Sequence, residues 1–289
     1  MDWEGGRRSD NVDNAPSGAG RPIAVGGGVL GLVGFILYYL LTGTAPPIQQ
    51  QTASYPQAQQ GPSSPAAQRE EDFVRVVVAS TEDTWAAVLP AQAQRQYVRP
   101  RLVVFDGAVE SACGFAQAAM GPFYCPPDQQ VYLDLSFFED LRRMGAPGDF
   151  GRAYVIAHEV GHHVQNLLGI ERRVRVLRSQ VGDRASANAI SVLTELQADC
   201  YAGVWAHHAN ANYQSTNRGQ LIHPEDIDSG LAAAASVGDD RLQRQATGRV
   251  VPESFTHGSS AQRVSWFKTG LQTGDLRSCD TFGKAGVRL

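Results

Sequence analysis

The most continuous apolar stretch of the chain is residues 23–41, which read IAVGGGVLGLVGFILYYLL and carry no charge. A helix rises about 1.5 Å per residue and needs about 20 apolar residues to cross the hydrocarbon core of a membrane, so this stretch is long enough. It exceeds the roughly 7–15 residues of a signal-peptide core, and no small-residue cleavage site follows it directly. We therefore expect one transmembrane helix over residues 23–42 rather than a cleaved signal peptide.

The apolar pattern stops in residues 43–69, where Gln, Pro, Ser and Ala dominate. A segment with so few large apolar side chains cannot bury enough surface to offset the entropy that is lost on folding. We expect a disordered tether here. The apolar pattern then resumes, so residues 70–289 are expected to form one folded domain.

Apolar residues at helical spacing dominate this domain. Phe73, Val77 and Trp85 recur as they do on the buried face of a helix. Short apolar runs predict two buried strands, at residues 102–105 and 131–135. Helices are expected at about residues 70–89, 136–144, 150–168, 185–208, 225–235, 239–246 and 260–271. The pattern therefore predicts a helix-rich α+β domain with a small sheet, preceded by one transmembrane helix.

The charge balance excludes one class of function. The chain carries 25 Lys and Arg against 29 Asp and Glu, a formal net charge of −4. A nucleic-acid binder normally shows a basic domain or stripe, so we expect no nucleic-acid partner. The densest basic run, Arg172, Arg173, Arg175 and Arg178, is interpreted as the solvated face of a helix.

Basic residues also predict an orientation in the membrane. Arg7, Arg8 and Arg21 precede the apolar stretch, whereas residues 42–68 contain no Lys or Arg. By the positive-inside rule, residues 1–22 are expected to be a cytoplasmic tail and the domain to be extracytoplasmic. The chain is thus predicted to be a single-pass membrane protein.

The four cysteines fit an extracytoplasmic compartment, where disulfides persist. Cys113 and Cys125 are close enough in sequence to close a small loop, and Cys200 and Cys279 could form a second bridge. Four cysteines allow three pairings, and the sequence alone does not choose among them. The chain has no Cys-x-x-Cys motif, which argues against a cysteine zinc knuckle or a redox motif.

The strongest chemical pattern is His158-Glu-Val-Gly-His162, inside the helix expected at residues 150–168. Two histidines four residues apart project from one helix face, so both can reach the same Zn²⁺. Glu159 lies beside them, where it can take a proton from water. A purely structural role would leave these polar side chains partly buried without partners. His163 points about 140° away from His158 on the helical period, so we exclude it as a ligand.

A third ligand is expected from another helix. Glu195 and Asp199 lie one turn apart in the helix predicted at residues 185–208. Glu195 would complete a two-histidine, one-carboxylate site that binds one Zn²⁺ per chain and leaves a position for water. Asp199 would accept a hydrogen bond from the outer nitrogen of a ligand histidine, by preference His158. The alternative is a solvated acidic pair, which apolar neighbours and like-charge repulsion disfavour.

These residues predict hydrolysis of peptide bonds. Zn²⁺ would lower the pKa of a water and polarise the scissile carbonyl, while Glu159 would carry the proton from this water to the leaving amine. A further donor is needed for the oxyanion, and His257 is the first candidate. The strand expected at residues 131–135 could offer an edge to an extended peptide. Three tyrosines are weaker candidates for the oxyanion donor: Tyr132, Tyr154 and Tyr201.

Several further motifs, taken in order, resemble the YpfJ-like neutral zinc metallopeptidases of bacteria over nearly the whole chain. The resemblance implies a zincin-like fold of the gluzincin kind, zinc as cofactor, a peptide or protein substrate, and a place in the bacterial cell membrane. The chain shows no departure at His158, His162 or Glu195. Besides the two helices above, the resemblance rests on Gly121-Pro-Phe-Tyr-Cys-Pro126, Val131-Tyr-Leu-Asp134, Gly148-Asp-Phe150, Gly238-Asp-Asp240 and Phe255-Thr-His-Gly-Ser-Ser260.

Two of these regions also resemble more distant peptidases. The Glu-x-x-x-Asp pattern of Glu195 and Asp199 is similar to that of thermolysin-like and HtpX-like enzymes, in which the Glu binds zinc and the Asp orients a histidine. The run from His257 to Arg263 resembles a His-Pro-x-x-x-x-Arg element of the HtpX-like enzymes. Gly258 stands where that element has Pro, so the local backbone is expected to differ.

Two other functions stay open at this point. One is a catalytically silent, zinc-binding scaffold or binding protein of the cell envelope. Such relatives of enzymes commonly lose the general base, whereas this chain has Glu159. The other is a zinc hydrolase that acts on a non-protein amide, although the chain has no recognisable cell-wall-binding repeat.

Overall fold

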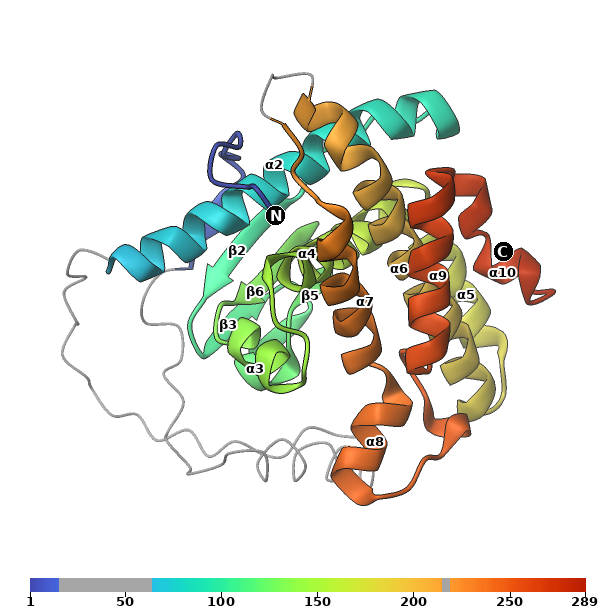
Figure 1. The fold of residues 1–289 in the computed structure, drawn as a ribbon. Helices are drawn as coiled ribbons and strands as arrows, with labels where there is room; N and C mark the ends of the chain where they lie inside the picture. Colours follow the sequence, from blue (N-terminus) through green and yellow to red (C-terminus); the bar gives the residue numbers. More distant parts are fainter. Residues whose placement is uncertain (16–63, 215–218) are drawn as a thin grey trace.

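The computed structural model describes residues 1–15, 64–214 and 219–289 (Figure 1). Within these residues, helices pack around a four-stranded sheet, and a two-stranded hairpin stands beside it. The predicted helix-rich α+β fold is confirmed. None of the helices in these three segments combines the length and hydropathy that a bilayer crossing requires, and the transmembrane helix predicted at residues 23–42 lies outside them.

The four-stranded sheet has the order β1-β2-β6-β5, with β1, β2 and β6 parallel and β5 antiparallel to β6. Leu102, Val131 and Leu133 face the core and are each 1% exposed. The expectation that β6 offers an edge to a peptide is wrong, because β2 and β5 flank this strand on its two sides. The strands are β1 (Val12–Asn14), β2 (Arg101–Phe105), β5 (Phe123–Cys125) and β6 (Gln130–Asp134), and the hairpin is β3 (Ala108–Ser111) with β4 (Gly114–Gln117).

The helix α4 (Asp149–Leu167) lies at the centre of the helical layer and packs against α2, α6 and α7. It begins after Gly148 and is followed by Gly169, whose φ angles of 108° and 72° favour glycine. Asp149 is its first helical residue. The other helices are α2 (Pro65–Ala93), α3 (Phe137–Arg143), α5 (Ile170–Gln180), α6 (Arg184–Gln214), α7 (Ile227–Ser236), α8 (Asp239–Thr247), α9 (Ser260–Thr273) and α10 (Thr281–Lys284).

An aromatic cluster fixes the spacing of α4, α6 and α9. Phe150 stacks on Trp205 with ring centroids 6.0 Å apart, and Tyr154 meets Phe267 edge-on at 5.4 Å. All four side chains are at most 1% exposed. Large rings buried together stabilise a helix interface through their contact area and geometry. The three helices that bear the candidate chemistry therefore share one rigid core.

The predicted helices are found close to their expected positions, but α2 begins earlier than expected. α2 begins at Pro65, inside the segment expected to be a tether, because Ser64 caps it by accepting a hydrogen bond from the amide of Ala67 at 3.2 Å. The rest of the expected tether, up to residue 63, lies outside the described residues. The arginine run falls in α5, where all four guanidinium-bearing residues are exposed, as the interpretation of a solvated face requires.

The structure pairs all four cysteines. Cys113 is bonded to Cys125 and Cys200 to Cys279, with Cα–Cα distances of 5.8 and 5.5 Å. The first bridge joins the β3–β4 turn to the end of β5. The second joins the middle of α6 to the short 3-10 helix η4 (Leu276–Cys279), which follows α9.

The N-terminal residues differ most from expectation. Residues 1–22 were predicted to be a cytoplasmic tail, separate from a domain over residues 70–289. Residues 1–15 instead lie against the domain, and β1 pairs in parallel with β2. The folded unit thus includes both ends of the described chain.

Candidate metal centre

The helix α4 places the two motif histidines one turn apart. His158 and His162 have ring centroids 4.8 Å apart and nearly perpendicular planes, as i,i+4 positions on one helix face allow. Gly161, between them, faces α6: a Cβ at this position would lie 3.0 Å from the backbone oxygen of Ala198. Glycine here therefore lets α6 come close to both histidines.

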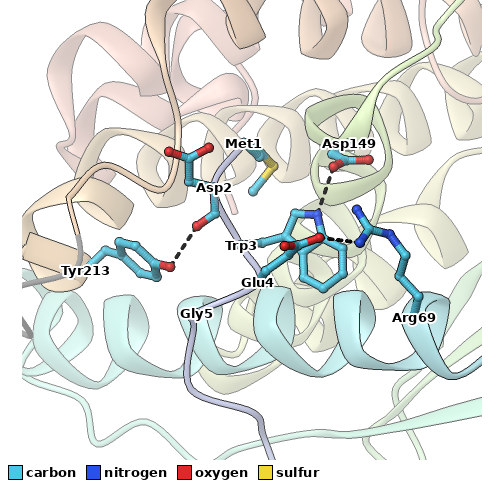
Figure 2. Close-up of a pocket in the computed structure, with 8 residues that line it drawn as sticks. All are labelled: Met1, Asp2, Trp3, Glu4, Gly5, Arg69, Asp149 and Tyr213. Carbon is cyan, nitrogen blue, oxygen red and sulfur yellow. Dashed lines mark hydrogen bonds and ion pairs between the residues drawn. The ribbon is translucent and has the colours of Figure 1, made fainter.

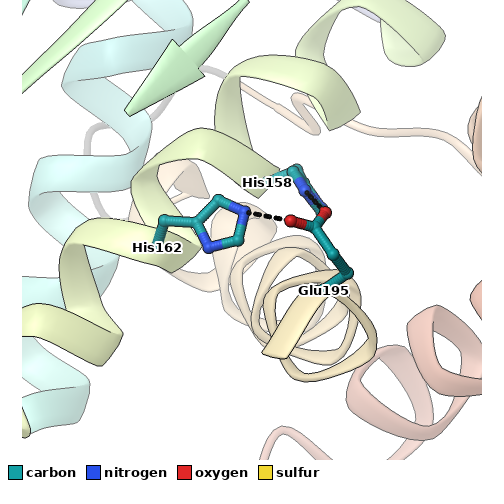
Figure 3. A group of neighbouring side chains, drawn as sticks. All are labelled: His158, His162 and Glu195. Atoms are coloured by element: carbon teal, nitrogen blue, oxygen red, sulfur yellow. Dashed lines mark hydrogen bonds and ion pairs between the residues drawn. The ribbon is translucent and has the colours of Figure 1, made fainter. Parts of the chain in front are cut away.

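The close approach of α6 brings Glu195 to the histidines (Figure 3). One carboxylate oxygen is 3.2 Å from Nε2 of His158, and the other is 3.5 Å from Nε2 of His162. The three ligand atoms all lie within 4.8 Å of one another, so this group could hold one metal ion. The structure thus brings together the three residues that the sequence pattern selected as ligands.

The outer nitrogen of each ring is held by an acceptor. Nδ1 of His158 is 2.9 Å from the carboxylate of Asp199, and Nδ1 of His162 is 2.9 Å from the amide oxygen of Gln165. The amide nitrogen of Gln165 donates to the backbone oxygen of Thr194 at 2.8 Å, which fixes the orientation of this amide. Since both partners can only accept, each Nδ1 carries the proton.

The position of these protons indicates whether the residues fit a metal ion. Neutral rings protonated at Nδ1 turn their Nε2 lone pairs toward the carboxylate of Glu195, so three acceptors face one another in a buried place. Such a group of acceptors needs either a proton or a cation between them. Without a cation, Glu195 raises the pKa of His162 to about 10, although burial opposes the charge. Two imidazoles and one carboxylate are ligands that suit Zn²⁺, so the residues present fit this ion.

Asp199 is itself held by a buried arginine. The Nε and Nη2 atoms of Arg263, on α9, each donate to one carboxylate oxygen at 2.9 Å, and Arg263 is 4% exposed. The hydroxyl of Tyr154 also donates to Asp199 and so is not free to serve as an oxyanion donor. Although burial opposes ionisation, Arg263 and His158 hold the pKa of Asp199 below its usual value. Arg263 entered the sequence interpretation only as the end of a motif, and the structure shows what it contacts.

Glu159 lies next to His158 on α4 and is 8% exposed. Its charge contributes to the raised pKa of His162, so it acts within electrostatic range of the centre. Within the described part of the chain, its carboxylate makes no hydrogen bond. A carboxylate that stands beside the ligands without a committed partner is available to accept a proton.

His257 lies in the loop before α9, with its side chain 51% exposed. Asp239 organises this loop: one oxygen accepts hydrogen bonds from the backbone amides of Thr256, His257 and Gly258, and the other is 3.3 Å from the His257 ring. Gly258 has a φ of 91°, which replaces the backbone that Pro would impose. Glu195 is among the charges that raise the pKa of His257, against the effect of burial, so the imidazole lies within range of the centre. The sequence interpretation gave no role to Asp239.

The remaining candidates contact other groups. His163, excluded as a ligand, is fully buried, and its Nδ1 accepts a hydrogen bond from Tyr124 at 3.0 Å. Burial lowers the pKa of His163 to about 4, so it is neutral at physiological pH. The hydroxyl of Tyr132 donates to Asp128 at 2.9 Å, and Tyr201 is buried in an apolar cluster. The contacts of these side chains are thus with groups other than the three candidate ligands.

The chain is similar to known proteins over almost its whole length. A family model described as "Putative neutral zinc metallopeptidase" matches residues 1–282. The uncharacterized protein YpfJ of Escherichia coli is 44% identical, over 99% of this chain and 100% of its own length. The uncharacterized protein Rv2575 of Mycobacterium tuberculosis is 47% identical, over 72% of this chain and 69% of its own length. No solved structure matches the chain.

Proposed function

Because the chain belongs to the family of neutral zinc metallopeptidases, as its motifs predicted, we propose that it is a zinc-dependent peptidase that hydrolyses peptide bonds. One observation carries this proposal: the ligand atoms of His158, His162 and Glu195 converge, with the uncommitted carboxylate of Glu159 beside them. A solvated acidic pair on α6 does not account for this convergence, because Asp199 is fully buried and Glu195 faces both histidines.

Each residue of the candidate site has its own proposed role in the reaction. His158, His162 and Glu195 would hold one zinc, which when bound supplies a Lewis acid for the scissile carbonyl and for the attacking water. Glu159 takes the proton from that water and gives it to the leaving amine, as a general base and then a general acid. Asp199 and Gln165 keep both histidines in the tautomer whose lone pairs face inward.

His257 is the proposed donor to the oxyanion. The Asp239 carboxylate fixes its backbone and contacts its ring, so the imidazole is presented from an ordered loop. With burial opposing the charge, Asp239 and Glu195 raise its pKa, which favours the protonated, donating form. A donor that is positioned before substrate binds can stabilise developing negative charge without reorganisation.

We further propose that this peptidase acts outside the cytoplasm of a bacterial cell and is held at the cell membrane by residues 23–42. The two disulfides support this place, since such bonds persist in oxidising compartments. The substrate is proposed to be a peptide or protein of the same compartment.

Metal analysis of the full chain tests the ligand set. After loading and removal of excess ion, we expect about one zinc per chain, and the His158→Ala and His162→Ala variants should hold much less. Folded protein that binds no zinc would show that the three residues are not a metal site.

The Glu159→Gln variant tests the chemistry. We expect it to keep its zinc and to lower kcat/KM on a peptide library by at least about 10²-fold, because the amide cannot accept the proton. Glu110→Gln, the same change at an exposed position on β3, should leave the rate unchanged. Wild-type rates in Glu159→Gln would rule out the general-base role. A zinc-loaded wild type that cleaves no peptide would favour the catalytically silent scaffold. If such a protein instead cleaves a non-protein amide, the second alternative would be favoured.

A further inference from the structure

Residues 1–15, here called the N-terminal strap, lie along α2. Residues 1–5 line a pocket together with Arg69 of α2, Asp149 and Tyr213 (Figure 2). Trp3 is 3% exposed, and its indole N–H donates to Asp149 at the start of α4, at 2.8 Å. Its ring meets Phe73 of α2 edge-on at 5.4 Å, and the guanidinium of Arg69 lies over it at 4.9 Å. The strap therefore adds a large side chain to the core and contacts the helix that carries the ligand histidines.

The strap also supplies the partners of a buried carboxylate. Glu82 of α2 is 1% exposed, and it accepts hydrogen bonds from Ser9 at 2.6 Å, Asn11 at 2.7 Å and Arg7 at 2.9 Å. Although burial opposes the charge, these bonds lower the pKa of Glu82. All three donors belong to the strap. Without the strap, Glu82 would lose all three of these donors.

The strap ends as a strand of the main sheet. Val12 of β1 lies opposite Leu102 of β2, and Asn14 lies opposite Val104. Val12 is 3% exposed and joins the same core cluster as Leu102. Paired strands share backbone hydrogen bonds, so β1 and β2 must be in the same compartment.

The arginines of the strap have carboxylate partners on α2. Arg7 contacts Asp83 at 2.7 Å in addition to Glu82, and Arg8 contacts both oxygens of Asp72, at 2.8 and 2.9 Å. Arg7 and Arg8 were two of the three residues that placed the N-terminus in the cytoplasm by the positive-inside rule. Their pairing with α2 gives them another role, recognition of the acidic face of the domain.

We propose that the N-terminal strap and the catalytic domain lie on the same side of the membrane and fold there as one unit. A bilayer crossing that left the strap in the cytoplasm would separate β1 from β2, Glu82 from its three donors and Trp3 from the core. Residues 1–15 and the domain that begins with α2 therefore both face outward, in the compartment that the disulfides require. This arrangement replaces the single-pass one with a cytoplasmic N-terminus, and it holds whether or not the domain is an active peptidase.

Cysteine labelling in intact cells tests the proposal on the full chain. The four native cysteines are paired, so a single introduced cysteine reports its own position. Asp10→Cys marks the strap and Ser179→Cys marks α5, both at exposed positions. We expect a membrane-impermeant maleimide to label both variants to the same extent before permeabilisation. Labelling of Ser179→Cys in intact cells, with Asp10→Cys labelled only after permeabilisation, would overturn the proposal.

Two neighbouring glycines provide a second, independent test. A Cβ at Gly6 would lie 2.5 Å from a methyl carbon of Val76 on α2, whereas a Cβ at Gly5 would meet only the Tyr213 hydroxyl, at 3.9 Å. If the strap is seated in the mature protein, Gly6→Ala should lower the melting temperature of the full chain by about 5 °C. Gly5→Ala should leave it unchanged. Equal melting temperatures for both variants and the wild type would show that the strap is not seated on α2.

Discussion

At the residue scale, the candidate metal centre is organised by side chains outside its three ligands. Asp199 and Gln165 hold the outer nitrogens of the two histidines, and Arg263 balances the buried charge of Asp199. These three side chains decide which ring atoms carry protons before any ion binds. The ligand set is therefore preorganised by hydrogen bonds from two other positions on the same helices and one on α9.

The Arg263→Met variant tests this support. It leaves Asp199 buried without its cationic partner, so we expect the free energy of unfolding to fall by about 3–5 kcal/mol. Arg263→Lys keeps the charge but cannot reach both oxygens, so its loss should be smaller. Chemical denaturation of the zinc-loaded proteins measures the difference. Arg172→Met, an exposed change on α5, is the control. An unchanged free energy in Arg263→Met would mean that this ion pair does not support the centre.

Local spacing explains which site residues the sequence predicted. His158, His162, Glu195 and Asp199 lie one helical turn apart in pairs, so the pattern alone selects them. The role of Asp239 depends on the loop 17 to 19 residues away, and no periodicity links such positions. Residues that act on distant segments of the chain are not visible in the sequence pattern.

At the element scale, the approach of α9 to α6 is the closest contact between the helices of the site. A Cβ at Gly270 of α9 would lie 1.9 Å from the backbone oxygen of Cys200, and a Cβ at Gly203 of α6 would lie 2.1 Å from that of Phe267. Only glycine at both positions permits this crossing. Because α9 carries Arg263, the crossing also sets the distance between Arg263 and Asp199.

The Gly270→Ala variant should therefore force the two helices apart. We expect a loss of about 1–3 kcal/mol in the free energy of unfolding from overpacking, together with weaker zinc binding as Arg263 moves away from Asp199. Gly182→Ala, where a Cβ meets nothing within 4 Å, is the matched control. Calorimetry and zinc titration measure both effects. A variant as stable as the wild type would contradict the tight crossing.

Among the elements, the sequence pattern did not predict the shortest strands. Except for α5, helices of ten residues or more left a clear apolar period, and the strands β2 and β6 left apolar runs. β1 and β5 have three residues each, too few for an alternating pattern to stand out. Their place in the sheet comes from partners elsewhere in the chain, which is also why β6 was mistaken for an edge.

At the scale of the whole molecule, two disulfides close loops of very different size. Cys113 and Cys125 are 12 residues apart, and Cys200 and Cys279 are 79 residues apart. The longer loop encloses α7, α8 and α9, so its bridge ties the last third of the molecule to α6.

Removal of the two disulfides should lower the stability of the protein to different extents. In the chain-entropy description, the Cys200–Cys279 bridge contributes about 4.5 kcal/mol and the Cys113–Cys125 bridge about 3 kcal/mol. We expect the double variant Cys200→Ala/Cys279→Ala to lose more stability than Cys113→Ala/Cys125→Ala. Denaturant titration of both purified proteins gives the comparison, and the reverse order would contradict it.

The N-terminal strap contacts residues that lie much later in the chain. Val12 pairs with Leu102, and the amino group of Met1 bonds to Asp226 at 2.8 Å. Contacts between such distant parts of a chain form slowly, because a large loop must close before any of them is gained. Until then, Glu82 stays uncovered on α2. The strap can therefore complete its contacts only after Asp226 has been synthesised, and the native state is reached no earlier.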